Sequence, residues 1–370
     1  MKVVWFSWKD IKHPLAGGAE TVSNNIREKL AQDGHEVILF TAKYKGSSRK
    51  DTVSGVQVRR YGNRYTVYLL CLVQFMFMPR SAFDIVIDEM NTLPFWVGAF
   101  TRKPRLLLCY QLAREVWYYQ LRSPFSTIGY KLEPIYLKIL AHFYPYAITE
   151  SNSTSIELKA HGFKSVDIFR VGMDLNPVDQ FRPATSSQMN NLVFLGALRP
   201  MKRPLDAIKA FEIAKKYLSN LTLTIVGSDV DSHAVLVKDY ASKSKYTDSI
   251  HFTGSVNGQD KVNALKNAGA IVATSIKEGW GLIVSEAGSQ GTPAVAYDAD
   301  GLRDSVNDGV TGVLAKNSNI RDLASQIVSL LSDPKKRNTF GNNAWEFSKQ
   351  FTFENSYQDF LKIVSKITDK

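Results

Sequence analysis

The segment from Lys277 to Pro293 reads KEGWGLIVSEAGSQGTP, and it decides which fold the chain is expected to adopt. An apolar, strand-like stretch from Ala270 to Thr274 precedes it, and Ile283 to Gln290 has a helical pattern. Another strand-like stretch, Ala294 to Tyr297, follows. Strand, glycine-rich turn, helix and strand in this order predict parallel strands joined by a helical crossover.

The same alternation runs back from this segment through the second half of the chain, as in a doubly wound sheet. It predicts a Rossmann-like domain over residues 176–350. The further elements expected in it are strands at 192–195, 221–226 and 250–252 and helices at 204–217 and 260–268.

The first half of the chain shows an alternation of its own, and 370 residues are too many for one ordinary core. We therefore expect an α/β protein with two Rossmann-like domains facing each other across a cleft, the first over residues 1–175. Its expected elements are strands at 3–6, 36–41, 85–87, 105–109 and 147–149 and a helix at 20–32.

A break in the pattern separates the two halves. Residues 172–185 read GMDLNPVDQFRPAT, with two prolines and little periodicity, which is typical of a linker. The last stretch, 351–370, is helical in pattern. It fits two arrangements, packing on the C-terminal domain or packing back on the N-terminal domain.

The glycines of the opening segment predict a ligand site, because ligands of such sheets collect at the carboxyl ends of strands. Gly279 and Gly281 let the backbone come close to a ligand, and the helix that opens near Leu282 presents free N–H groups. These groups and the helix dipole favour a pyrophosphate.

Two glutamates flank this turn. Glu286 lies one turn into the helix, where its carboxylate can accept hydrogen bonds from ribose hydroxyls, and Glu278 faces the other end of the ligand. For either glutamate alone, a solvated capping residue is the simpler interpretation. For the whole string, a ligand site is favoured.

Two more loops follow strands and contain glycine or lysine. HPLAGGAE places Gly17 and Gly18 before a helix, which suits a phosphate or sugar oxygen and equally suits a plain strand-to-helix connection. GALRPMKRP places Lys202 where its charge can neutralise a diphosphate, with a solvated lysine as the alternative. Gly227 ends the strand at 221–226, where it either admits a base or ribose or is a steric turn.

Together these segments resemble glycosyltransferase family 4, the retaining nucleotide-sugar enzymes of the GT-B fold. Glu278 to Pro293, with Trp280 as its aromatic residue, looks like the family's E-G-(aromatic)-G-L-x-x-x-E-A donor signature followed by G-T-P. VGMDLNPVDQFRP, with a longer gap before Phe181, looks like the inter-domain segment, and GLRDSVNDGVTGVL looks like the segment after the donor helix.

The resemblance implies roles for several residues and exposes two departures. It places the Gly17-Gly18 loop against the donor phosphates and the acceptor. Gly196, Leu198 and Lys202 match the family pattern G-R-L-x-x-x-K-G. Ala197 stands at its diphosphate-binding arginine, so Arg199 or Arg203 would have to reach in. Tyr110 stands where many relatives have a sugar-binding histidine, and its ring either orients the donor or simply packs.

Composition bounds the partners. A formal charge of +11 calls for a polyanion, and no nucleic-acid module is recognisable, so no nucleic-acid partner is expected. The apolar run from Thr66 to Pro79 is too short to span a bilayer comfortably. It predicts either a buried helix or, because Arg80 follows it, a helix that dips into an anionic membrane face. The aromatic and basic stretch 101–146 leaves the same choice between core and a surface for acceptor or membrane.

The remaining expectations concern location and metals. Cys71 and Cys109 lie in apolar surroundings without metal-ligand spacing, which fits a reducing cytoplasm. The N-terminus MKVVWFSWKD lacks the pattern of an export signal. Asp229 and Asp231 match a D-x-D motif, but we interpret them as solvated loop residues, so neither a metal ion nor another cofactor is expected.

Taken together with this resemblance, the sequence predicts a metal-independent hexosyltransferase with Glu278 and Lys202 as its catalytic residues, and the resemblance implies that it is a retaining enzyme. Its donor is a nucleotide sugar, and its acceptor is a glycan or lipid-linked glycan of cell-envelope synthesis. The expected location is the cytoplasm, with peripheral contact with the inner face of an anionic membrane as an option. The alternative is a sugar-nucleotide-binding protein with weakened catalysis.

Overall fold

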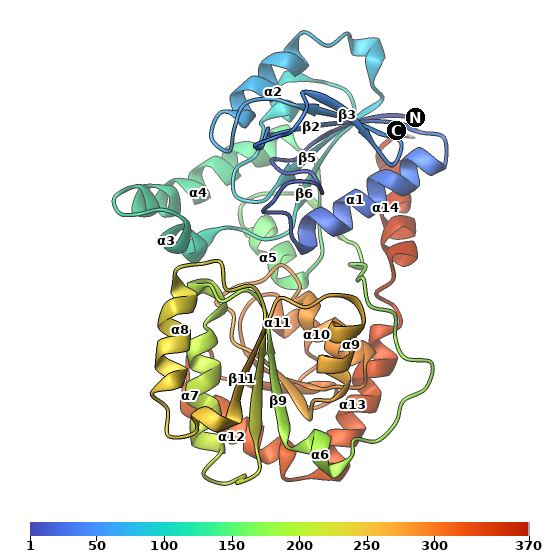
Figure 1. Cartoon of the computed structure of the whole chain (residues 1–370). Helices are drawn as coiled ribbons and strands as arrows, with labels where there is room; N and C mark the ends of the chain where they lie inside the picture. The colour runs from blue at the N-terminus through green and yellow to red at the C-terminus, as the bar shows by residue number, and fades with distance from the viewer. Residues whose placement is uncertain (369–370) are drawn as a thin grey trace. The chain divides into compact units, whose positions relative to one another are not determined.

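The computed structural model describes residues 1–368 and divides the chain into two compact units (Figure 1). Unit 1 comprises Met1–Gly172 and the segment from Thr352 onward, and unit 2 comprises Met173–Phe351. The sequence pattern predicts boundaries after residues 175 and 350. The last two residues of the predicted helix 351–370 lie outside the described part of the chain.

Unit 1 is built on an eight-stranded sheet in the order β3-β4-β2-β1-β5-β6-β7-β8. Every pairing is parallel except that of β3 with β4. The elements of unit 1 are β1 Lys2–Phe6, α1 Gly18–Gln32, β2 Glu36–Thr41, β3 Lys50–Val53, β4 Val56–Arg60, α2 Val67–Met76, η1 Arg80–Ala82, β5 Ile85–Met90, η2 Val97–Phe100, β6 Arg105–Cys109, η3 Arg114–Val116, α3 Trp117–Gln120, α4 Phe125–Phe143, β7 Tyr146–Thr149, α5 Asn152–Ala160, β8 Ser165–Ile168 and α14 Phe353–Thr368.

Helices cover both faces of this sheet, because successive strand residues point to opposite faces. Val4 and Phe6 of β1 pack against the buried side of α2. Trp5 points to the other face, where its ring lies 5.5 Å from that of Phe360 in α14. The C-terminal helix α14 therefore completes the core of unit 1, beside α1 (Figure 1).

Unit 2 is built on a six-stranded, all-parallel sheet in the order β11-β10-β9-β12-β13-β14. Its elements are α6 Ser186–Met189, β9 Asn191–Leu195, η4 Pro200–Lys202, α7 Pro204–Ala214, β10 Thr222–Val226, α8 His233–Ser242, η5 Thr247–Ser249, β11 Ile250–Gly254, α9 Gly258–Lys266, β12 Ala270–Ala273, α10 Leu282–Ser289, β13 Ala294–Tyr297, α11 Leu302–Ser305, β14 Gly312–Ala315, α12 Ile320–Leu331 and α13 Pro334–Ser348.

Two apolar clusters sandwich the sheet of unit 2. One cluster joins α7, α8 and α12 to one face, and the other joins α9 and α10 to the opposite face (Figure 1). The amphipathic pattern of α12 is typical, since Leu323, Ile327 and Leu330 recur at helical spacing and are fully buried.

The α/β fold class with two parallel-sheet domains is confirmed, and every predicted strand overlaps a strand of the structure. The predicted linker, 172–185, contains no helix or strand. The apolar run Thr66–Pro79 forms α2, which buries Val67, Cys71 and Phe75 but leaves other apolar side chains exposed. No helix within residues 1–368 is long and apolar enough to cross a membrane.

Candidate functional site

The loops that contain the predicted site residues of unit 2 meet at one place in its sheet. The chain builds outward from β9 through β10 to β11 and then returns to place β12 on the other side of β9. Such a reversal of strand order opens a crevice at the carboxyl ends of the two central strands, where ligands bind in open α/β sheets. The loops after β9 and β12 flank this point.

Hydrogen bonds fix the two loops to each other. The Thr274 hydroxyl donates to the carbonyl oxygens of Lys202, at 2.8 Å, and Arg203, at 2.9 Å. The backbone N–H of Ile276 donates to the Met201 carbonyl oxygen at 2.9 Å. The position of Lys202 is therefore set by the end of β12, about seventy residues away in sequence.

This arrangement joins the two residues predicted to be catalytic. The Lys202 ammonium and the Glu278 carboxylate form a direct ion pair. Their side chains keep 25% and 16% of their exposure, so the pair is open to a ligand. An ammonium and a carboxylate beside each other can bind a phosphate and a sugar hydroxyl, respectively.

Glu286 occupies a more buried position on α10. Burial raises the pKa of its carboxyl, and the neighbouring ammonium of Lys261, 2.5 Å away, opposes that effect. Lys261 lies on α9 and was not among the predicted site residues. The sequence holds no signal for this contact, because it depends on how α9 packs beside α10.

The turn before α10 has the conformation that its glycines suggest. Gly281 has φ = 82°, and an added Cβ would lie 2.9 Å from the Ser305 hydroxyl oxygen. The first-turn N–H groups of Leu282 and Ile283 have no partner within the helix. These N–H groups follow Glu278 by four and five residues, at the start of α10. The turn therefore offers hydrogen-bond donors to an anion.

The side chain of Trp280 is used for packing. Its indole N–H donates to the Ser285 hydroxyl at 2.9 Å, and its ring lies 5.0 Å from that of Phe351. The motif's aromatic residue thus fixes the turn from inside unit 2, next to Gly279.

The loop after β13 contacts the backbone of Glu278. The Glu278 N–H donates to the Asp300 carbonyl oxygen at 3.0 Å, and a Cβ at Gly301 would lie 2.3 Å from the Glu278 carbonyl oxygen. The Lys277 ammonium lies 2.6 Å from the Asp300 carboxylate. Asp300 was not predicted as a site residue, although it directly precedes the segment GLRDSVNDGVTGVL that resembles the family.

The arginines that might replace the one missing at Ala197 differ in their surroundings. The Arg203 guanidinium donates to Asn317 at 3.1 Å and to Ser318 at 2.7 Å, so it is held beside β14. Arg199 is exposed and has no ion pair within residues 1–368. Arg199 is therefore the one with freedom to reach a ligand.

Gly227 has a steric reason to be glycine. An added Cβ would lie only 1.8 Å from the Gly196 carbonyl oxygen, because the loop after β9 passes directly over the end of β10. This contact favours the steric interpretation, and it places Gly227 beneath the loop that contains Lys202.

The predicted phosphate loop of unit 1 follows β1, which borders the reversal of strand order between β1 and β5. The Gly17 N–H donates to the Glu20 carboxylate at 2.7 Å, and the Lys9 ammonium lies 3.0 Å from the same oxygen. Gly17 is thus engaged inside the loop. Gly18 and Ala19 supply the helix N-terminal N–H groups that have no partner within α1.

Tyr110 lies in the interior of unit 1. Burial raises the pKa of its hydroxyl well above the ordinary range, and the Glu89 carboxylate adds to that effect. With 4% exposure, the side chain favours the packing interpretation. Asp229, by contrast, is exposed and pairs with Lys238, and the Asp231 carboxylate accepts the N–H of His233.

Comparison with known proteins agrees with this geometry. Residues 177–347, just under half of the chain, match the family model described as Glycosyl transferases group 1. Unit 2 therefore carries a domain of that family, and the matched region includes every predicted site residue of that unit.

Curated relatives are similar over part of their length. A poly(glycerol-phosphate) alpha-glucosyltransferase of Bacillus subtilis is 25% identical over 76% of this chain and 44% of the relative. A glycogen synthase of Mycobacterium tuberculosis is 30% identical over 50% of this chain and 44% of its own length. The chain spans about half the length of the curated relatives that it matches.

Solved structures match the whole chain. Sucrose-phosphate synthase from Thermosynechococcus elongatus has a TM-score of 0.79 at 19% identity, covering 100% of this chain and 99% of that one. The Anabaena protein HepE, solved with UDP and glucose, has a TM-score of 0.72 at 17% identity over 99% and 100% of the two chains. The fold is the two-domain α/β fold of GT-B glycosyltransferases.

Proposed function

We propose that this chain is a glycosyltransferase that moves a hexose-type sugar from a nucleotide-sugar donor, with retention and without a metal ion, to a glycan or lipid-linked acceptor. The observation that carries the proposal is the ion pair between Lys202 and Glu278 at the reversal of strand order in unit 2. The group 1 domain that contains this pair supports it.

In the proposed reaction the bond between the anomeric carbon and the diphosphate oxygen breaks as the acceptor oxygen bonds to the same carbon. Lys202 and the N–H groups at the start of α10 stabilise the charge that develops on the departing diphosphate. Glu278 binds the sugar and faces the positive charge on the ring, and Glu286 accepts hydrogen bonds from the ribose. The departing phosphate takes the acceptor's proton, so no side chain is assigned as general base.

The ion pair has a consequence for donor binding. Before the donor binds, Lys202 and Glu278 are each other's partner. Each charge compensates the other, so both side chains stay ionised in a partly buried site. The donor's phosphate replaces the carboxylate as the partner of Lys202, and a sugar hydroxyl replaces the ammonium as the partner of Glu278. The exchange replaces the one charged hydrogen bond between Lys202 and Glu278 by two, one from Lys202 to the phosphate and one from the sugar hydroxyl to Glu278.

The acceptor side of the proposal is supported by the relatives' names. One relative is called a poly(glycerol-phosphate) alpha-glucosyltransferase, and one structural neighbour, WaaG, is described as involved in lipopolysaccharide biosynthesis. We propose a cell-envelope polysaccharide or lipid-linked glycan as the acceptor. We also propose that the chain acts in the cytoplasm, in peripheral contact with an anionic membrane.

The test combines a panel of donors with matched variants. Thermal shift with UDP, GDP, ADP and dTDP sugars identifies the donor, and transfer is then measured with it. We expect Lys202→Met and Glu278→Gln each to lower kcat/KM by about 10²- to 10³-fold, as for the loss of one transition-state contact. Glu286→Gln should mainly weaken nucleotide binding.

The exposed ion pair between Asp239 on α8 and Lys243 just after this helix provides the control, so Lys243→Met and Asp239→Asn should leave kcat/KM unchanged. Full activity in both Lys202→Met and Glu278→Gln would rule out this site. Tight donor binding without turnover or hydrolysis would favour the alternative, a sugar-nucleotide-binding protein, which Ala197 motivates because the expected arginine is missing.

A further inference from the structure

Exposed apolar side chains gather in one part of unit 1. Fourteen of the twenty-two large hydrophobic side chains that are exposed in the described chain lie between Tyr65 and Ile139. Single exposed hydrophobic residues are ordinary, but a concentration of them marks an interaction surface. The fourteen are Tyr65, Leu69, Leu70, Met76, Phe77, Leu93, Phe100, Tyr118, Tyr119, Phe125, Ile128, Leu132, Ile135 and Ile139.

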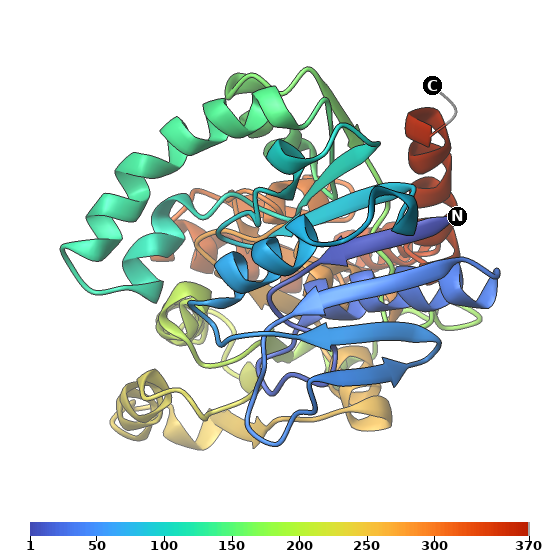
Figure 2. The ribbon, with the colours of Figure 1, turned by 90° about the horizontal axis from the view of Figure 1, so that it is seen from above.

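The two helices that contribute most of them, α2 and α4, lie on the same face of the sheet. Phe75 of α2 packs with Val86 of β5, and Leu137 of α4 packs with Leu107 of β6. Val86 and Leu107 point to one face, because β5 and β6 pair with Asp88 opposite Leu107. The outer sides of α2 and α4 therefore belong to one surface of unit 1 (Figures 1 and 2).

The outer side of α4 is an apolar stripe with lysines beside it. Its five exposed apolar residues recur at alternating spacings of three and four, which puts them on one side of a helix. The exposed residues Lys131 and Lys138 flank the stripe. The only carboxylate of α4, Glu133, is fully buried, where it accepts the N–H groups of Ala113 and Arg114.

The outer side of α2 has the same character. No charged residue occurs from Tyr65 to Pro79, and Arg64 and Arg80 stand at the two ends of this run. Phe77, just after the helix, is 84% exposed, and Met76 is 58% exposed. Both apolar surfaces are thus bordered by cations.

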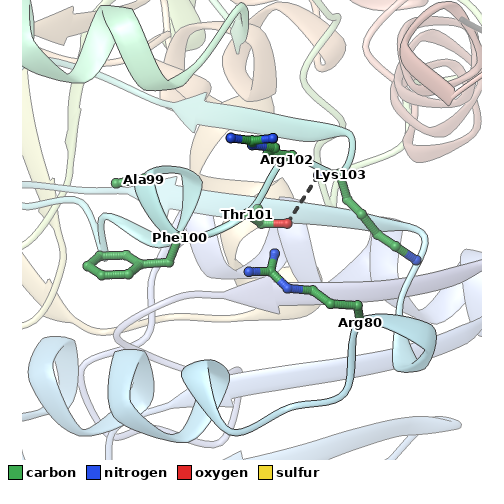
Figure 3. Close-up of a pocket in the computed structure, with 6 residues that line it drawn as sticks. All are labelled: Arg80, Ala99, Phe100, Thr101, Arg102 and Lys103. Carbon is green, nitrogen blue, oxygen red and sulfur yellow. Dashed lines mark hydrogen bonds between the residues drawn. The ribbon is translucent and has the colours of Figure 1, made fainter.

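A basic pocket lies at the edge of this surface, in front of β5 and β6 (Figure 3). Its volume is about 520 Å³, and Arg80, Phe100, Thr101, Arg102 and Lys103 line it together with an alanine. None of these residues is acidic. Within residues 1–368, the guanidinium groups of Arg80 and Arg102 have no ion pair, while the ammonium of Lys103 donates to the Phe83 carbonyl oxygen. The pocket opens at the amino ends of the strands, at the edge opposite to the predicted ligand loops.

We propose that the outer surface of α2, η2 and α4 docks on a bilayer that contains anionic phospholipid, with the pocket of Arg80, Arg102 and Lys103 holding a headgroup phosphate. We call it the α2–α4 surface. An apolar stripe with cations beside it is the pattern of a helix that lies in the membrane interface. Long basic side chains can keep their charge at the headgroups while their stems lie on the apolar side.

This assignment explains the charge better than a protein partner does. The cores of protein interfaces are depleted in lysine, and α4 places two lysines beside its stripe. Two unpaired arginines at an open pocket need an anion, which a phospholipid headgroup supplies. The proposal deepens the membrane contact of the proposed function, but it does not depend on sugar transfer.

The test measures binding of the whole chain to vesicles in the absence of donor. The vesicles are phosphatidylcholine alone or a one-to-one mixture with phosphatidylglycerol, and binding is followed by co-sedimentation. We expect binding to the anionic vesicles only, weakening with salt. Arg80→Gln with Arg102→Gln should weaken it about 30-fold, from a factor of about five for each basic residue near the surface. Ile128→Ser with Ile135→Ser should weaken it at least tenfold.

Matched controls come from unit 2, where Val235 and Leu236 are similarly exposed on α8 and Lys216 and Lys335 are exposed. Val235→Ser with Leu236→Ser, and Lys216→Gln with Lys335→Gln, should bind vesicles like the parent chain. Circular dichroism melting verifies that each variant is folded. If a variant does not fold, Ile139→Ser replaces the isoleucine pair.

Three outcomes would overturn the proposal. One is equal binding of the parent and the arginine variant. Another is saturation of the pocket by inorganic phosphate without any vesicle binding, which would assign it to a free anion. The third is a dimer that Ile128→Ser with Ile135→Ser dissociates, which would assign the surface to a second copy. Vesicle binding that persists in a chain without transfer activity would count against the proposed function alone.

Discussion

Ala197 follows Gly196 in the loop that contains Lys202, at the position where the family pattern has an arginine. Its neighbour Arg199 is exposed, whereas Arg203 is held by Asn317 and Ser318. If the diphosphate lacks a bidentate partner, an arginine introduced at 197 should supply one, because guanidinium matches phosphate oxygens in pairs.

We therefore predict that Ala197→Arg leaves kcat/KM for the donor unchanged or raises it up to about tenfold, the effect of about 1.4 kcal/mol. Steady-state kinetics at several donor concentrations measures the change. Ala197→Lys serves as the control for charge without the fork geometry. A large loss of activity in Ala197→Arg would mean that Arg199 already occupies the space.

Asp88 is a buried acid that the proposed reaction does not use. It accepts the N–H of Phe95 at 2.9 Å and the hydroxyl of Tyr144, and burial raises its pKa to about 6. Its folded-state pKa lies above the ordinary value of 3.8, so the folded chain holds this proton more tightly than the unfolded chain. The resulting stabilisation is present below about pH 4 and is lost as the pH rises toward 6.

The predicted pH dependence concerns Asp88→Asn, which imitates the protonated acid. Over the range from pH 4 to 6 the free energy of unfolding of the parent should fall by about 2 kcal/mol relative to this variant, because most of the difference between the two pKa values takes effect in that range. Urea unfolding at several pH values measures it. A difference between parent and variant that does not change with pH would contradict the raised pKa.

The loop after β9 shows how a single side chain can determine the geometry of an element. Thr274 donates to two carbonyl oxygens of this loop, at Lys202 and Arg203. Thr274→Val keeps the shape and removes both hydrogen bonds, each with a net value of about 1 kcal/mol. We predict a donor KM raised about tenfold with a small loss of stability, because Lys202 loses its fixed position.

Donor titration by calorimetry and thermal melting together test this prediction. Thr311→Val is the control, since Thr311 is also buried but its hydroxyl donates to the Asn307 carbonyl oxygen in the loop after α11 instead. Equal donor affinity in Thr274→Val and the parent would show that the loop is held without this residue.

The elements that the sequence predicted are those with strong periodicity, such as β1 and α1. The hairpin of β3 and β4 was not predicted, because its strands are short and largely polar. Its signal is the pair Ser54 and Gly55, with φ of 47° and 84°, the left-handed conformations of a two-residue hairpin turn. The predicted helices and strands thus followed from the hydrophobic pattern. The pairing of β3 with β4 depends instead on the conformation of the turn at Ser54 and Gly55.

Individual site residues were less predictable than the loops that contain them. Motif spacing placed Glu278 and Glu286 around one turn, but it could not show that Lys261 pairs with Glu286 or that Lys202 pairs with Glu278. Those contacts join side chains that are far apart in sequence, and they exist only through sheet order. For Tyr110 the sequence left two interpretations open, orientation of the donor or packing, and the burial of its side chain favours packing.

At the scale of the whole molecule, the chain leaves unit 1 at Gly172 and returns to it at Thr352. The returning helix α14 completes the core of unit 1, where Phe360 is fully buried against Trp5. Separate hydrophobic cores allow the two units to open independently, as cooperative units of unequal stability. The packing of α14 should therefore contribute strongly to the stability of unit 1.

We predict that Phe360→Ala destabilises unit 1 by about 3 to 5 kcal/mol, the usual cost of removing a buried phenylalanine ring. Hydrogen exchange should accelerate in β1 and β5, while β10 in the core of unit 2 keeps the rate of the parent. Tyr217→Ala, which removes an exposed ring from unit 2, is the control and should change neither. Equal acceleration of hydrogen exchange in both sheets would mean that the two units unfold together. The packing of α14 on unit 1 would then stabilise the whole chain.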